Sequence, residues 1–153
     1  AIVRYVRRKH NILIGKRTAE ELKIGIACLV PRAEVGIQEV KGRCLMTGLP
    51  KTITVNSTEM MEAFEEPVER ILEAVHGVLE RTPPELASDI MKNGIYLTGR
   101  AAQLYALDQY IANELNIQVI LAKDPGDCTV LGLGYIVENL ALLAQQGRMP
   151  QLN

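Results

Sequence analysis

The sequence predicts an α/β protein with an incomplete parallel sheet and a separate, small antiparallel hairpin. Residues 95–144 alternate strand, helix, strand and helix, and a strand–helix–strand of this length implies a parallel pair with a right-handed crossover. Residues 35–45 and 50–56 read as two strands around a loop that contains a glycine. Because two parallel strands do not form a stable sheet alone, we expect partner strands outside this chain or an assembly of copies.

Composition excludes several classes of protein. The chain has 153 residues, of which 48% are hydrophobic and 23% are charged, so it is neither disordered nor collagen-like. Its net charge is −1, which argues against a nucleic-acid binder. Cys28, Cys44 and Cys128 lie far apart and without CxxC spacing, so we expect reduced, packed thiols rather than a disulfide framework or a zinc site.

The first residues have the apolar spacing of a helix. We expect this helix to end near Asn11. It starts without a cap at Ala1, so we expect the chain to be a piece of a longer protein. A second helix is expected to begin with a capping box formed by Thr18 and Glu21 and to run to about Ile26.

A long helix is predicted from Ser57 to about Arg81. Pro67 lacks the amide hydrogen that a helix interior needs, so we expect a break or a kink near Glu66. The apolar residues that share one face of this helix are expected to be buried: Val68, Ile71, Leu72, Val75 and Leu79.

The second half of the chain is predicted to begin with a helix that follows Pro83 and Pro84 and ends at Gly94. The remaining elements are then expected in this order: a strand at 95–98, a helix at 101–115, a strand at 119–122, a helix at 128–144 and a loose tail at 147–153.

Four segments of the sequence carry a resemblance to a known family. They are IGKRTAEELKI, KGRCLMTGLPKTITVNS, VLERTPPELASDIMKNGIYLTG and DPGDCTVLGLG. In this order they resemble the C-terminal half of MreB and Mbl, the bacterial actin homologues that determine rod shape. The resemblance implies half of an actin-like, ribonuclease H-like fold. Residues 1–17 and 82–153 would belong to an incomplete inner βαβα subdomain, and residues 18–81 would form a small outer α+β subdomain with the antiparallel hairpin.

The resemblance also implies a cytoskeletal function. Intact members of the family are weak ATPases that bind ATP or ADP with Mg, form head-to-tail filaments and guide cell-wall synthesis. Such a protein is cytoplasmic and peripheral to the inner face of the cell membrane. Its partners would be further copies of itself, a RodZ-like membrane protein and the cell-wall elongation machinery, with no direct membrane anchor in this chain.

The family's phosphate-binding loops and catalytic carboxylates would lie upstream of this sequence. We therefore expect no catalytic residue, no metal site, no bound nucleotide and no ATPase activity in this chain alone.

Glu20 and Lys23 match the Glu-x-x-Lys motif that lies beside adenosine in the family. At a spacing of i and i+3 they share one face of a helix. The carboxylate would accept hydrogen bonds from ribose hydroxyls, and the stem of the lysine would flank the base. Spacing alone favours a solvated ion pair, whereas the resemblance favours the ATP site. The family usually has Glu where this sequence has Lys16.

Thr98 and Gly99 match the start of the family's TGGGA turn, which passes against adenine. Arg100 and Ala101 replace its next two glycines. A β-carbon at a position that needs positive φ costs about 1 kcal/mol or more. The Arg100 side chain could enter the adenine pocket, stack on the base or point to solvent.

These substitutions support an alternative hypothesis, a degenerate MreB-like module that no longer binds ATP and acts only in protein–protein docking. A third hypothesis, a small free-standing enzyme, finds no organised nucleophile, base or metal cluster in the sequence.

Overall fold

The computed structural model describes residues 1–145. The expected tail at 147–153 lies outside the described residues. The elements are, in chain order, α1 (Ile2–His10), β1 (Ile12–Leu13), α2 (Lys16–Ile26), β2 (Ile37–Cys44), β3 (Pro50–Asn56), α3 (Ser57–Leu79), α4 (Pro84–Asn93), β4 (Ile95–Leu97), the 3₁₀ helix η1 (Arg100–Gln103), α5 (Leu107–Leu115), β5 (Val119–Leu121), α6 (Cys128–Glu138) and α7 (Leu140–Gln145).

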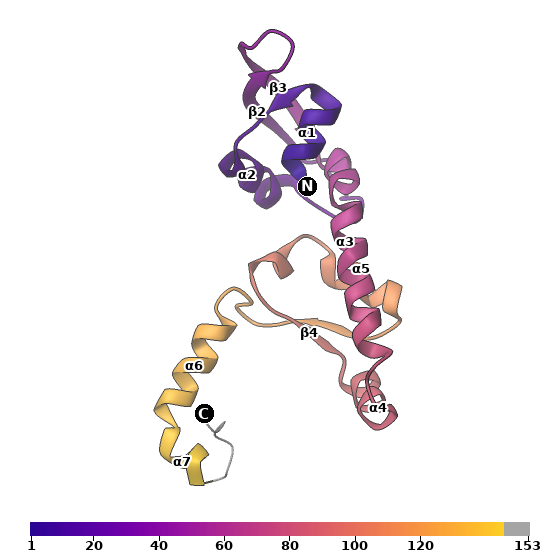
Figure 1. The fold of residues 1–153 in the computed structure, drawn as a ribbon, viewed down its shortest axis with the longest axis vertical. Helices are drawn as coiled ribbons and strands as arrows, with labels where there is room; N and C mark the ends of the chain where they lie inside the picture. Colours follow the sequence, from indigo (N-terminus) through magenta and orange to yellow (C-terminus); the bar gives the residue numbers. More distant parts are fainter. Residues whose placement is uncertain (146–153) are drawn as a thin grey trace.

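The predicted hairpin is confirmed and gains a third strand. β2 and β3 pair antiparallel, with Val40 opposite Ile53, and Gly48 in the connecting loop has a φ of 74°. β1 adds to the other edge of β2, with Ile12 opposite Cys44. The resulting sheet has the order β1-β2-β3 and lies with α1 and α2 at one end of the molecule (Figure 1).

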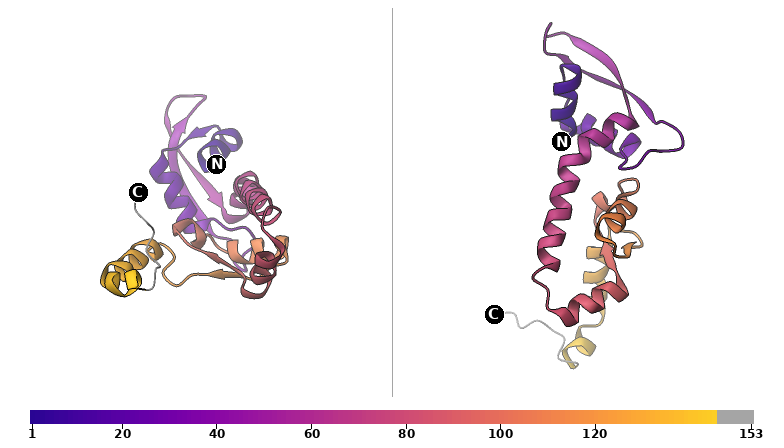
Figure 2. Two further views of the ribbon diagram at one scale, coloured as in Figure 1. Left: turned by 60° about the horizontal axis from the view of Figure 1, so that its bottom comes forward. Right: turned by 90° about the vertical axis from the view of Figure 1, so that its right-hand side faces the viewer.

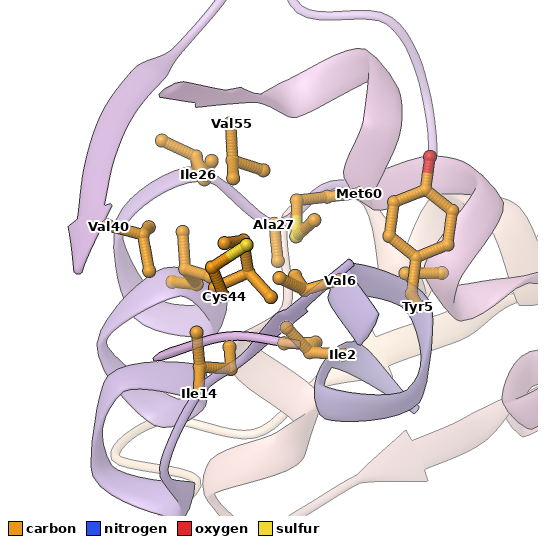
Figure 3. Packing of buried hydrophobic residues seen from close by; sticks show 13 residues of the cluster. Ile2, Tyr5, Val6, Ile14, Ile26, Ala27, Val40, Cys44, Val55 and Met60 are labelled. Carbon is orange, nitrogen blue, oxygen red and sulfur yellow. The ribbon is translucent and has the colours of Figure 1, made fainter. Parts of the chain in front are cut away.

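The first hydrophobic core lies between this sheet, α1, α2 and the first turns of α3 (Figure 3). Side chains alternate along β3, so that Val55 is buried while Thr54 and Thr52 are exposed. The buried members of the core are Ile2, Tyr5, Val6, Ile12, Ile14, Leu22, Ile26, Ala27, Val40, Cys44, Val55, Met60 and Ala63. Burial of this surface, at about 25 cal/mol per Å², is what stabilises so small a sheet.

Ion pairs along one side of this core join α1 to α3. The Tyr5 hydroxyl donates to Glu62 Oε2 at 2.8 Å, and Lys9 Nζ donates to Glu62 Oε1 at 3.1 Å. These two hydrogen bonds favour the ionised carboxylate, so they lower the pKa of Glu62 below its ordinary value. One turn away, His10 Nε2 lies 3.0 Å from Glu59 Oε2.

α3 runs through Pro67 without a break. It begins at Asn56, whose side-chain oxygen accepts from the Glu59 amide at 2.9 Å. Figure 2 shows the first turns of α3 at an angle to the rest of the helix. The expected kink is therefore present, because Pro67 removes one hydrogen bond and crowds the preceding turn, and the alternative of a break is wrong.

The second core lies where the lower part of α3 meets α5. Its buried members are Val68, Leu72, Leu107 and Ile111. Beside it, β4 and β5 form the predicted parallel pair, with Ile95 opposite Val119.

Fewer residues on the apolar face of α3 are buried than the sequence predicts. Val75 and Leu79 are half-buried and Ile71 is exposed. These three residues line an apolar groove together with Ile90 of α4 and Ile95 of β4.

The segment before α5 departs from the predicted single helix over 101–115. η1 ends at Gln103, and Ala106 has a left-handed φ of 62°. This interruption lets the Tyr105 carbonyl accept from the Leu29 amide at 3.2 Å, next to an isolated bridge between Cys28 and Tyr105. A long-range contact thus overrides the local helical pattern.

The predicted capping box is also wrong. α2 begins at Lys16 with Gly15 as its N-cap and no side-chain cap, so Thr18 lies inside the helix. The first turn of the helix is closed by the backbone instead, where the Ala19 amide donates to the Gly15 carbonyl at 3.1 Å.

The predicted helix at 128–144 is interrupted at Asn139 between α6 and α7. α6 has no buried residue, and it extends away from the two cores (Figure 1). Within residues 1–145, no helix is both long enough and apolar enough to cross a membrane.

We expect Leu72→Ala to lower the free energy of unfolding by about 2–4 kcal/mol, because it removes a buried side chain from the second core and leaves a cavity. Urea unfolding followed by circular dichroism measures the loss. Glu73→Ala, at an exposed position on the same helix, is the control. A loss below about 0.5 kcal/mol for Leu72→Ala would mean that α3 does not pack on α5.

The lowered pKa of Glu62 predicts an acid-dependent loss of stability. The folded carboxyl has a lower pKa than the unfolded one, so its contribution is complete above the ordinary glutamate pKa of about 4.3 and is lost as the pH falls through the folded value. Glu62→Gln should therefore reduce the difference in urea midpoint between pH 7 and pH 3. Glu73→Gln should leave that difference unchanged, and an unchanged difference in Glu62→Gln would contradict the assignment.

Candidate functional site

A cavity of about 430 Å³ lies between α2 and the segment from η1 to the start of α5. It is lined by Glu20, Lys23, Ile24, Ala27, Arg32, Arg100, Ala101, Gln103, Leu104 and Tyr105. Four residues that the sequence singles out line it together: Glu20, Lys23, Arg100 and Ala101. Thr98 and Gly99 do not line it.

α2 supplies one wall of the cavity. Leu22 and Ile26, four residues apart, are buried in the first core. Their burial fixes the rotation of the helix and turns Glu20 and Lys23 toward the cavity. Lys23 Nζ lies 2.7 Å from Glu20 Oε1, so the ion pair expected from the spacing is present. The Glu20 side chain is 57% exposed, which leaves its carboxylate open to a ligand as well as to the lysine.

The turn after β4 supplies the support for the opposite wall. Gly99 has a φ of 83°, a conformation that favours glycine, and its amide donates to the Pro125 carbonyl. Thr98 is exposed at the start of this turn. Both residues shape the turn from which η1 begins.

The expected backbone strain at Arg100 and Ala101 is wrong. Neither residue has a positive φ, because the chain enters η1 directly after Gly99, with the Ala102 amide donating to the Gly99 carbonyl at 3.1 Å. The stem of Arg100 lies against Gly126, where an added β-carbon would be only 3.1 Å from Arg100 Cγ. Arg100 thus lies at the cavity without strain and brings a positive charge to its wall.

Arg32 and Tyr105 line the cavity as well, and sequence reasoning missed them. The Arg32 guanidinium lies over the Tyr105 ring, 4.6 Å from its centroid. Its NH2 group donates to the Ala27 carbonyl at 2.9 Å. No periodicity or motif joins these residues, since they come from loops that are far apart in the chain.

The polar lining of the cavity is rich in donors. Lys23, Arg32 and Arg100 bring three cationic groups, while Glu20 is the one carboxylate among the lining residues. Such a wall suits a ligand with hydroxyl groups for Glu20 and acceptor atoms for the cations. Within residues 1–145, no three side chains of His, Cys, Asp or Glu lie close enough together to hold a metal ion.

The incomplete parallel sheet, the small antiparallel unit and the cavity between them define half of an actin-like fold. The family model described as MreB/Mbl protein matches residues 1–145. The chain therefore belongs to the MreB/Mbl family.

Relatives in this family are named for cell shape. The chain is 44% identical over 145 residues to the cell shape-determining protein Mbl of Bacillus subtilis, covering 95% of this chain and 44% of that protein. It is 46% identical over 138 residues to the cell shape-determining protein MreB of Escherichia coli K12, covering 90% of this chain and 40% of that protein. The chain thus spans less than half the length of these relatives.

Solved structures give the same fold. MreB5 of Spiroplasma citri bound to AMPPNP matches with a TM-score of 0.90 at 32% identity, over 95% of this chain and 44% of that one. The same protein bound to ADP matches with a TM-score of 0.88 at 33% identity, over 91% of this chain and 42% of that one.

Proposed function

We propose that this chain is part of an MreB-like cytoskeletal protein that forms ATP-dependent filaments under the bacterial membrane and guides cell-wall synthesis. Family membership supports the role in cell shape. The observation that carries the nucleotide part is the cavity, which places Glu20 and Lys23 opposite Arg100. One solved relative of the same fold, MreB5 of Spiroplasma citri, has been seen with AMPPNP and with ADP.

The lining residues have the chemistry to hold the nucleoside part of ATP. The Glu20 carboxylate accepts hydrogen bonds from the two ribose hydroxyls, and its ion pair with Lys23 holds it in place. The exposed side chain of Ile24 and the stem of Lys23 flank a planar base. Bound ATP would supply the phosphoryl group that is hydrolysed, and this chain's residues bind and orient the nucleoside.

Self-association is part of the same proposal. A contact between two different surfaces of one protein does not close on itself and therefore propagates as a filament. The partners proposed beyond further copies are a RodZ-like membrane protein and the cell-wall elongation machinery, at the inner face of the membrane.

A second candidate function is a docking module that no longer binds ATP. The observation that favours it is the Arg100 side chain at the cavity, where the family's turn has glycine. A guanidinium in this place could occupy the volume that the base needs.

The nucleotide proposal is tested in a chimera in which residues 1–145 replace the matching segment of Bacillus subtilis Mbl. We expect the chimera to bind labelled ATP and to restore rod shape in cells that lack Mbl. Glu20→Ala should weaken ATP binding about tenfold or more, because a charged hydrogen bond to the ribose is lost. Glu21→Ala is the matched control, since Glu21 pairs with Arg17 on α2 and does not line the cavity. Equal affinities in the two variants would contradict the proposed site.

The two candidate functions differ in what Arg100→Gly does in that chimera. If Arg100 only crowds the base, its removal should tighten ATP binding by about fivefold, a gain near 1 kcal/mol. Arg81→Gly, at an exposed arginine in the turn after α3, should have no effect. Unchanged affinity would remove the main support for the docking module, and weaker binding would make Arg100 itself a ligand.

A further inference from the structure

Arg32 makes a set of contacts that join the two walls of the cavity. On the side of α2, its NH2 group donates to the Ala27 carbonyl at 2.9 Å and its NH1 group to the Gly25 carbonyl at 3.5 Å. On the side of η1, its guanidinium lies 4.6 Å from the centroid of the Tyr105 ring. One planar side chain thus contacts the C-terminal end of α2 and the loop that precedes α5.

Both contacts need a guanidinium rather than a simple positive charge. The fork of Arg32 reaches two carbonyl groups at a helix C-terminus, where the helix dipole favours a cation. Its flat face stacks on Tyr105, an arrangement that a lysine ammonium reproduces poorly. Arg32 Nε is buried and without a hydrogen-bond partner in the described structure, which is a cost to folding.

The backbone beside Arg32 holds the same two segments together. The Leu29 amide donates to the Tyr105 carbonyl at 3.2 Å, and Cys28 forms an isolated bridge to Tyr105. These backbone contacts fix the main chain of Tyr105 but leave its ring free to turn, and the residue is 48% exposed. The side-chain contact recorded for this ring is the one with the Arg32 guanidinium.

We propose that Arg32 is a positioning residue that holds the Tyr105 ring as one wall of the cavity and so sets the width of the space between α2 and η1. It acts on a ligand through Tyr105 and through the end of α2. Its importance for nucleotide binding rests on the proposed function, whereas the position of the ring does not.

The position of the ring is measured without any ligand. The chain contains no tryptophan, so Tyr105→Trp introduces a single fluorescent indole at the wall of the cavity. An indole is the best aromatic partner for a stacked cation, so this parent variant keeps the contact. Quenching of its emission by acrylamide reports how well the ring is covered.

We expect Arg32→Ala in the Tyr105→Trp parent to raise the quenching constant by about twofold or more, because the stacked guanidinium no longer covers the ring. Arg32→Lys should give a similar rise although it keeps the charge. Arg17→Ala, at an exposed arginine of α2 that does not line the cavity, should leave the constant unchanged. Far-UV circular dichroism identifies any variant that fails to fold. If Arg32→Ala does not fold, Arg32→Lys still tests the position of the ring.

Equal quenching in the parent, Arg32→Ala and Arg32→Lys would overturn the proposal. If Arg32→Lys protects the indole from acrylamide as well as the parent does, a planar guanidinium is not needed and that part of the proposal is wrong. Because no nucleotide is present, a failure here is distinct from a failure of the ATP titrations in the chimera, which test the proposed function.

Discussion

One helix contributes side chains to both hydrophobic cores of this protein. Near its start, α3 places Met60 and Ala63 against the antiparallel sheet, and further along it places Val68 and Leu72 against α5. A continuous helix is stiff, so the bend that Figure 2 shows in α3 sets how the two cores are oriented. The cavity lies where α2 of the first core approaches η1, so we expect its shape to depend on that orientation.

The two walls of the cavity are oriented by different physical causes. α2 is oriented by the burial of Leu22 and Ile26, which leaves Glu20 and Lys23 to face the cavity. The opposite wall is oriented by Gly99, whose left-handed backbone starts η1. Arg100 has no positive φ, so it brings a positive charge to this wall without backbone strain. We therefore expect nucleotide binding at this site to depend on the charge and the volume of the Arg100 side chain.

The sequence predicted the parts of the fold that local patterns encode. Alternation along β3 and the strand–helix–strand order of the second half led to the hairpin and the parallel pair, and the resemblance led to Glu20 and Arg100. The interruption before α5 was missed because it depends on the contact between Leu29 and Tyr105, which leaves no periodic signal. Arg32 was missed for the same reason, since its partners are backbone carbonyls and a distant ring.

We propose above all that the nucleoside binds in this cavity. A crystal structure of the Mbl chimera with ADP tests it most directly. We expect the ribose hydroxyls to lie within hydrogen-bonding distance of the Glu20 carboxylate, with the base between α2 and η1 and beside the stem of Lys23. ADP bound elsewhere, or a cavity filled by the Arg100 side chain while ADP is bound by other residues, would contradict it.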